Sequence, residues 1–73
     1  MTDSKRLKEV VKASGLKKKF IAEKIGVSYR SYLNKENGVT GFYSNEIIII
    51  KDLLRLSMQE ATEIFFYPPI ERG

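Results

Sequence analysis

Carboxylates, hydroxyls and lysine amines are the groups of this chain that could do chemistry, because its 73 residues include no Cys and no His. Without them the sequence has no thiol or imidazole nucleophile, no imidazole base, no disulfide and no ordinary zinc site. Ser, Lys and Glu remain, but no motif arranges them as nucleophile, base and orienting group around one pocket. A domain of this size rarely contains a deep substrate pocket. We therefore expect a binding module and not an enzyme, with no metal and no cofactor.

The basic side chains are concentrated in the first half of the chain. Residues 1–37 contain ten Lys and Arg against four Asp and Glu, whereas residues 38–73 contain three against five. The net charge of +4 is therefore the sum of +6 in the first half and −2 in the second. A positive field of this kind favours a polyanionic partner, because bound phosphates release their counterions. A solvated lysine-rich face is the alternative explanation.

Composition places the chain among folded globular domains. Hydrophobic residues make up 42% and charged residues 30% of the sequence, unlike a disordered tail. The longest aliphatic run, residues 47–50, is far shorter than the ~20 residues that cross a bilayer. The first residues have no apolar segment typical of an export signal. We expect a cytoplasmic protein with no membrane partner and no small-molecule substrate.

Five short helices must position the charged groups. Apolar residues recur at helical spacing, and caps or glycines mark most of the boundaries. The expected helices cover residues 5–13, 17–25, 29–36, 44–56 and 57–66. The expected N-caps are Asp3 or Ser4 for the first helix, Ser28 for the third, and Ser57 in a capping box with Glu60 for the fifth. The predicted architecture is a single all-α domain.

Two features of this assignment depend on particular residues. The second and third helices are separated only by Gly26, Val27 and Ser28, which is the length of a helix-turn-helix turn. The fourth helix is ambiguous locally, because four consecutive isoleucines at 47–50 favour a buried strand. The length of the segment and its flanking residues favour a helix, because a helical wheel places only Ile48 among the charged residues.

Residues 16–38 resemble the helix-turn-helix of the Cro/repressor-type (XRE-like) DNA-binding family of phage and other bacterial regulators. The matching residues are Leu16, Ile21, Ala22, Ile25, Gly26, Val27, Ser28, Tyr32, Asn37 and Gly38. Downstream residues, from Phe42 to Phe66, are similar to the C-terminal part of small Cro-like regulators from phages of Gram-positive bacteria. The resemblance implies a lambda-repressor-like fold, with helices 2 and 3 as the motif, C-terminal helices over 44–66 and a short tail over 67–73.

The resemblance also implies which residues contact DNA. In this family the start of the third helix reads base edges in the major groove, and neighbouring groups bind phosphates. The implied base-contacting residues are Tyr29, Arg30 and Asn34. Arg30 can form two hydrogen bonds with guanine, and Asn34 can pair with adenine. Tyr29 can contact a thymine methyl group with its ring or a phosphate with its hydroxyl. The implied backbone contacts are Lys17, Lys18, Lys19, Ser28, Ser31, Lys35 and Thr40.

Some apolar residues depart from the family's pattern or lie outside the core stripes. Phe20 and Leu33 stand where polar residues are usual, and Tyr43 stands where a capping Thr is usual. The apolar residues outside the core stripes are Ile48, Phe66 and Tyr67. Such leftover groups favour a partner or dimer surface. Cro-like proteins commonly dimerise through this region, which places two recognition helices about one DNA turn, ~34 Å, apart.

Two functional hypotheses follow from the resemblance. The first is a sequence-specific transcriptional regulator that binds operator DNA as a homodimer, acting in a phage lysis-lysogeny switch in the bacterial cytoplasm. The alternative is a modulator of repression, or antirepressor, which acts mainly by binding the partner phage repressor and masking its DNA-binding surface. Phe20, Tyr29 and Leu33, near the third helix, would suit a protein interface as well as a DNA groove.

Overall fold

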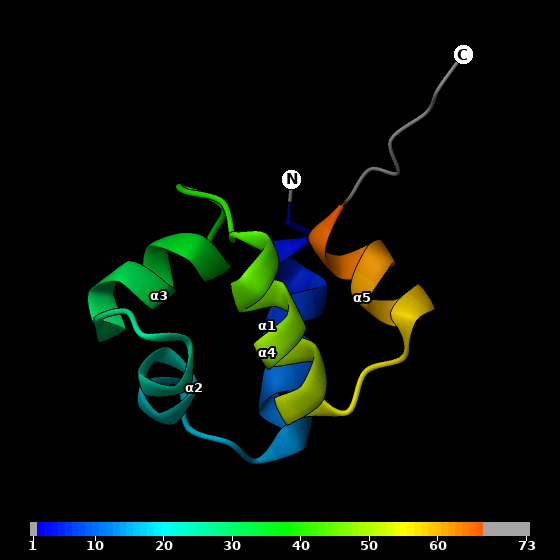
Figure 1. The fold of residues 1–73 in the computed structure, drawn as a ribbon, viewed down its shortest axis with the longest axis horizontal. Coiled ribbons are helices and arrows are strands. Elements are labelled where there is room, and N and C mark those ends of the chain that lie inside the picture. Colours follow the sequence, from blue (N-terminus) through cyan, green and yellow to red (C-terminus); the bar gives the residue numbers. More distant parts are fainter. Residues whose placement is uncertain (1, 67–73) are drawn as a thin grey trace.

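The computed structural model describes residues 2–66 and contains five helices in that range. They are α1 (Ser4–Ser14), α2 (Lys18–Ile25), α3 (Tyr29–Glu36), α4 (Ser44–Leu54) and α5 (Met58–Phe65). No strand occurs between residues 2 and 66, so the isoleucine run is helical and the all-α prediction is confirmed. α2 and α3 lie to one side of α1 and α4, and α5 lies to the other (Figure 1). No helix of the described chain is long and apolar enough to cross a membrane.

Side-chain caps explain where three of the helices begin. Asp3 and Ser28 each accept the backbone N–H three residues further on, at 3.1 and 3.0 Å. Ser57 and Glu60 form both hydrogen bonds of the predicted capping box, at 3.0 and 2.8 Å. The backbone N–H of Ser57 holds the pKa of the Glu60 carboxyl below its ordinary value. Of the two expected caps for α1, Asp3 is the one used. α2 has no side-chain cap and begins one residue later than expected, after Lys17.

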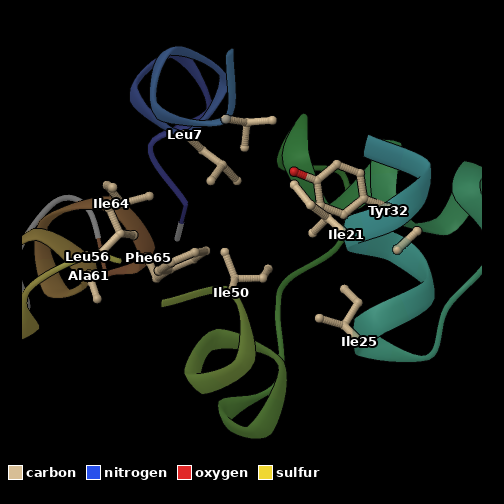
Figure 2. Close-up of a cluster of buried hydrophobic side chains, with 11 residues drawn as sticks. Leu7, Ile21, Ile25, Tyr32, Ile50, Leu56, Ala61, Ile64 and Phe65 are labelled. Atoms are coloured by element: carbon tan, nitrogen blue, oxygen red, sulfur yellow. The ribbon is translucent and has the colours of Figure 1, made fainter. Parts of the chain in front are cut away.

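The core is one cluster to which all five helices contribute (Figure 2). Its buried members are Leu7, Val11, Ile21, Ala22, Ile25, Tyr32, Ile50, Leu56, Ala61, Ile64 and Phe65. Ile50 of α4 lies between the side chains of α2 and those of α5 (Figure 2). Phe42, from the loop before α4, packs edge-on against Tyr32 at 6.2 Å and Phe65 at 5.2 Å between ring centroids. The α3–α4 loop is therefore attached to the core by one aromatic ring.

α4 ends two residues earlier than the sequence pattern predicts, at Leu54. Arg55 adopts a left-handed conformation with φ of 56°, the only positive φ of a non-glycine residue in the described chain. The N–H of Leu56 then donates to the carbonyl of Lys51 at 2.9 Å, which closes the helix end. The turn directs Leu56 into the core, where it is 8% exposed. Burial of Leu56 thus stabilises a backbone conformation that arginine disfavours.

This strain generates a stability prediction. Arg55→Gly is expected to raise the free energy of unfolding by about 1 kcal/mol, because glycine adopts a left-handed conformation without the steric penalty of a Cβ. Urea denaturation of the variant and the wild type measures the difference. Arg55→Ala is the matched control, since it removes the same side chain but keeps the Cβ, and it should give no gain. Equal stabilisation by both variants would contradict the explanation.

Candidate functional site

α2 and α3 are joined by a tight connection of Gly26, Val27 and Ser28. Gly26 has a φ of +82°, a conformation that suits glycine. The N–H of Val27 donates to the carbonyl of Ala22 at 3.0 Å, and Ser28 caps α3. Ala22 is 2% exposed, and Val27 packs against the core from the turn. The end of α2 and the start of α3 are therefore held in one fixed arrangement.

The two faces of α3 differ in what they carry. Its inner face buries Tyr32, Lys35 and Glu36. Its first turn exposes Tyr29, at 42%, and Arg30. Asn34 follows Arg30 by one helical turn, so the two lie on the same side of the helix, and Asn34 is half-buried. Of the three residues expected to contact bases, Tyr29 and Arg30 are therefore exposed and Asn34 is partly covered.

A buried carboxylate connects α3 with the start of α2. Glu36 is 0% exposed, and its carboxylate accepts hydrogen bonds from the Tyr32 hydroxyl at 3.0 Å and from Lys18 Nζ at 2.8 Å. Burial raises the pKa of Tyr32, and the adjacent Glu36 charge raises it further, so the phenol stays protonated as a donor. Lys18 therefore neutralises an internal charge from a half-buried position. The phosphate contact expected of Lys18 stays a prediction, since the side chain is 36% exposed.

A second buried carboxylate lies on the other side of α3. Lys35 Nζ is 3.1 Å from Glu46 Oε1 and donates to the Gly41 carbonyl at 3.0 Å. The two charged side chains are only 8% and 6% exposed. The expectation that Lys35 contacts a DNA phosphate does not agree with this placement, because its ammonium group is enclosed by protein. No local pattern in the sequence marks Glu36 and Glu46 as buried, although Glu46, three residues after Tyr43, has the spacing of a helix cap.

The remaining basic residues of this region are on the surface. Lys17 and Lys19 are exposed at the start of α2, and Lys19 Nζ lies 5.7 Å from the centre of the Tyr29 ring. Lys24 makes a similar contact with Phe20, at 5.3 Å. One exposed lysine, Lys19, therefore lies beside the exposed first turn of α3.

An open hollow of about 460 Å³ lies beside α3. It is lined by Val27, Ser31, Lys35, Thr40, Gly41, Phe42, Tyr43 and Glu46. Ser31 and Lys35 from α3 and Thr40 from the following loop all border it, so three of the expected backbone contacts share one concave surface. Thr40 is exposed and Ser31 is half-buried.

A separate apolar groove lies between α4 and α5. It encloses about 200 Å³ and is lined by Ser44, Ile47, Ile48, Lys51, Met58, Ala61, Thr62 and Phe66. Ile48 is 59% exposed and Phe66 is 41% exposed, as their positions outside the core stripes predict. Met58, which is 73% exposed, completes the surface and was not expected from the sequence. Tyr67, the third residue expected here, lies outside the described residues.

Comparisons of this chain with protein family models, with curated proteins and with solved structures found no match. A function must therefore be inferred from the residues and their arrangement.

The Lys18–Glu36 pair generates a prediction about stability. Lys18→Met should lower the free energy of unfolding by about 2 kcal/mol, because it leaves the buried Glu36 carboxylate with Tyr32 as its only partner. The partial exposure of Lys18 keeps the loss below that of a fully buried pair. Thermal or urea unfolding measures the effect. Lys8→Met on α1 removes the same charge from an exposed position and should change stability by less than about 0.5 kcal/mol; equal losses would refute the role of Glu36.

Proposed function

We propose that this protein is a sequence-specific DNA-binding transcriptional regulator of the Cro/repressor type, in which α2 and α3 form a helix-turn-helix. The observation that carries the proposal is the pairing of α2 and α3 across a three-residue turn, with Tyr29 and Arg30 exposed on the first turn of α3. This unit lies in the half of the chain with a net charge of +6. An exposed helix start that carries an arginine and has a lysine beside it suits insertion into the major groove.

In the proposed complex, α3 lies in the major groove with its first turn towards the base edges. Arg30 donates two hydrogen bonds to O6 and N7 of a guanine, and Asn34 pairs with an adenine. Tyr29 contacts a thymine methyl group. Lys17 and Lys19 bind phosphates on the strand beside α2, and Ser28, Ser31 and Thr40 donate to phosphate oxygens around α3.

The proposed operator complex contains two copies of the chain. The groove between α4 and α5, with Ile48 and Phe66 at its surface, is the proposed contact between the copies. Burial of these exposed apolar groups supplies the free energy of association. A symmetric dimer presents two copies of α3 to successive major grooves, about one DNA turn apart. The proposed setting is the cytoplasm of a bacterial host, in a phage lysis-lysogeny switch.

The exposed aromatic rings near α3 favour a second candidate function. Phe20 is 38% exposed, Tyr29 is 42% exposed and Tyr43 is 71% exposed, and exposed aromatics are typical anchors of protein interfaces. In this alternative the protein is an antirepressor that binds a phage repressor through this surface and covers the repressor's DNA-binding helices. The two functions differ in whether the protein alone binds DNA.

The first prediction of the proposed function concerns DNA binding. Selection from random duplexes should recover a preferred sequence, and affinity for it should fall steeply between about 50 and 200 mM salt. Arg30→Ala should weaken specific binding by about 1–3 kcal/mol and relax the preference at one base pair. Fluorescence anisotropy measures both effects. Arg55→Ala, which removes an exposed arginine from the far end of α4, is the charge-matched control and should keep the base preference.

The same experiment separates the two candidate functions. If the protein selects no sequence and binds no duplex at low salt, but forms a stable complex with a Cro/repressor-type protein from the same genome, the operator-binding function fails and the antirepressor function stands.

The second prediction concerns the dimer. Sedimentation equilibrium should detect a species of twice the 8.4 kDa chain mass, either in solution or on operator DNA. Ile48→Asp should abolish this species without loss of helical circular dichroism, because it places a charge in the apolar groove. Ala13→Asp changes an exposed aliphatic residue of α1 that does not line the groove, and it should leave the dimer intact. A monomer at high concentration both with and without DNA would refute the dimer.

A further inference from the structure

The loop between α3 and α4, residues 37–43, is tied to both helices by one pair of charges. Lys35 Nζ, from the last turn of α3, donates to the Gly41 carbonyl at 3.0 Å and lies 3.1 Å from Glu46 Oε1. The same Glu46 oxygen accepts the backbone N–H of Tyr43 at 2.9 Å, at the start of α4. One ammonium and one carboxylate therefore join the end of α3, the loop and the beginning of α4.

Two aromatic rings also lie beside the Lys35 ammonium. It lies 4.8 Å from the centre of the Tyr43 ring and 5.9 Å from that of Phe42. These contacts replace the water that a lysine normally keeps. If Lys35 turned outward to a phosphate, the Glu46 carboxylate, 4% exposed as a residue, would remain buried without its counterion. The geometry therefore favours an internal role for Lys35.

The two halves of the loop are held by different groups. The carbonyl of Asn34 accepts the N–H groups of Val39 and Thr40, at 2.9 and 3.4 Å, which ties the first half directly to the end of α3. The second half is held by Phe42, which packs on the core, and by the contacts of Lys35 with Gly41 and Glu46. Thr40 is the last residue of the first attachment and directly precedes Gly41, and it borders the same hollow as Ser31.

We propose that Lys35 is a positioning residue, which holds the α3–α4 loop against α3 and so places Thr40 beside Ser31 for contact with a DNA phosphate. The tether itself is a property of the folded chain, whereas its effect on binding rests on the function proposed above. Lys35 acts through the loop and does not touch DNA.

Amide hydrogen exchange tests the tether without DNA. Lys35→Met keeps the aliphatic length of the side chain but removes the ammonium, so the Tyr43 amide should exchange about tenfold faster than in the wild type. The Ile50 amide, in the middle of α4, reports any general loss of stability. Lys8→Met, which removes an exposed lysine of α1, should change neither amide. If Lys35→Met accelerates exchange of the Tyr43 amide no more than exchange of the Ile50 amide, the tether is refuted.

The salt dependence of DNA binding distinguishes positioning from direct contact. Lys35→Met should weaken operator binding about tenfold and leave the slope of log affinity against log salt unchanged, because no phosphate contact is lost. A direct contact would lower the slope by about one, and that result would overturn the proposal. Thr40→Val should weaken operator binding severalfold in the wild-type background. In the Lys35→Met background it should weaken binding by less than about twofold, since the two changes act on the same contact. Additive effects would also overturn it.

A second variant keeps the test decisive if Lys35→Met does not fold. Lys35→Met combined with Glu46→Gln removes both charges, and the amide oxygen of the introduced glutamine can still accept the Tyr43 N–H. We expect this variant to fold, with the same unchanged salt slope and the same weakened binding; wild-type affinity in it would overturn the proposal. Wild-type protein that binds no DNA would refute the proposed function alone, because the exchange experiment still decides whether Lys35 holds the loop.

Discussion

The neutralisation of two buried carboxylates is the constraint on which the arrangement around α3 depends. Glu36 and Glu46 are 0% and 4% exposed, and a carboxylate at such a depth is strongly destabilising unless a counterion and hydrogen bonds accompany it. Lys18 and Lys35 supply the counterions, from α2 and from α3 itself. α3 is consequently linked to α2 through one pair and to α4 through the other. The outer face of α3 can then carry exposed polar and aromatic groups, because the two ion pairs fix the orientation of the helix.

Apolar packing alone would hold these helices together, but with less definition of their relative positions. A hydrophobic contact is not directional, whereas an ion pair with satisfied hydrogen bonds is favourable only over a narrow range of geometry. In this small core, Tyr32 combines the two kinds of interaction. Its ring packs against Phe42 and its hydroxyl donates to Glu36. The same side chain thus links the hydrophobic core to the charged network behind α3.

The lysines of the basic half divide into two groups with different physical roles. Lys17 and Lys19 are exposed and contribute to the field that a polyanion meets, which salt screens. Lys18 and Lys35 compensate internal charge, and the low accessibility of their partners shields those pairs from salt. A count of basic residues in the sequence therefore overstates the number available to a polyanionic partner. The position of each ammonium relative to a buried carboxylate decides which group it joins.

The sequence by itself determined the helices, most of their caps and the core. These depend on local signals: Ser28 and Ser57 cap a helix a few residues away, Gly26 permits a turn, and the spacing of apolar residues selects the buried face. Only the tertiary structure decided the pairing of Lys18 with Glu36, the enclosure of Lys35 and the left-handed turn at Arg55. The two ion pairs join residues that are distant in the chain, and the Arg55 turn depends on the burial of Leu56. Neither the ion pairs nor the turn can be read from a local sequence pattern, because the stabilising partner comes into contact only when the helices pack.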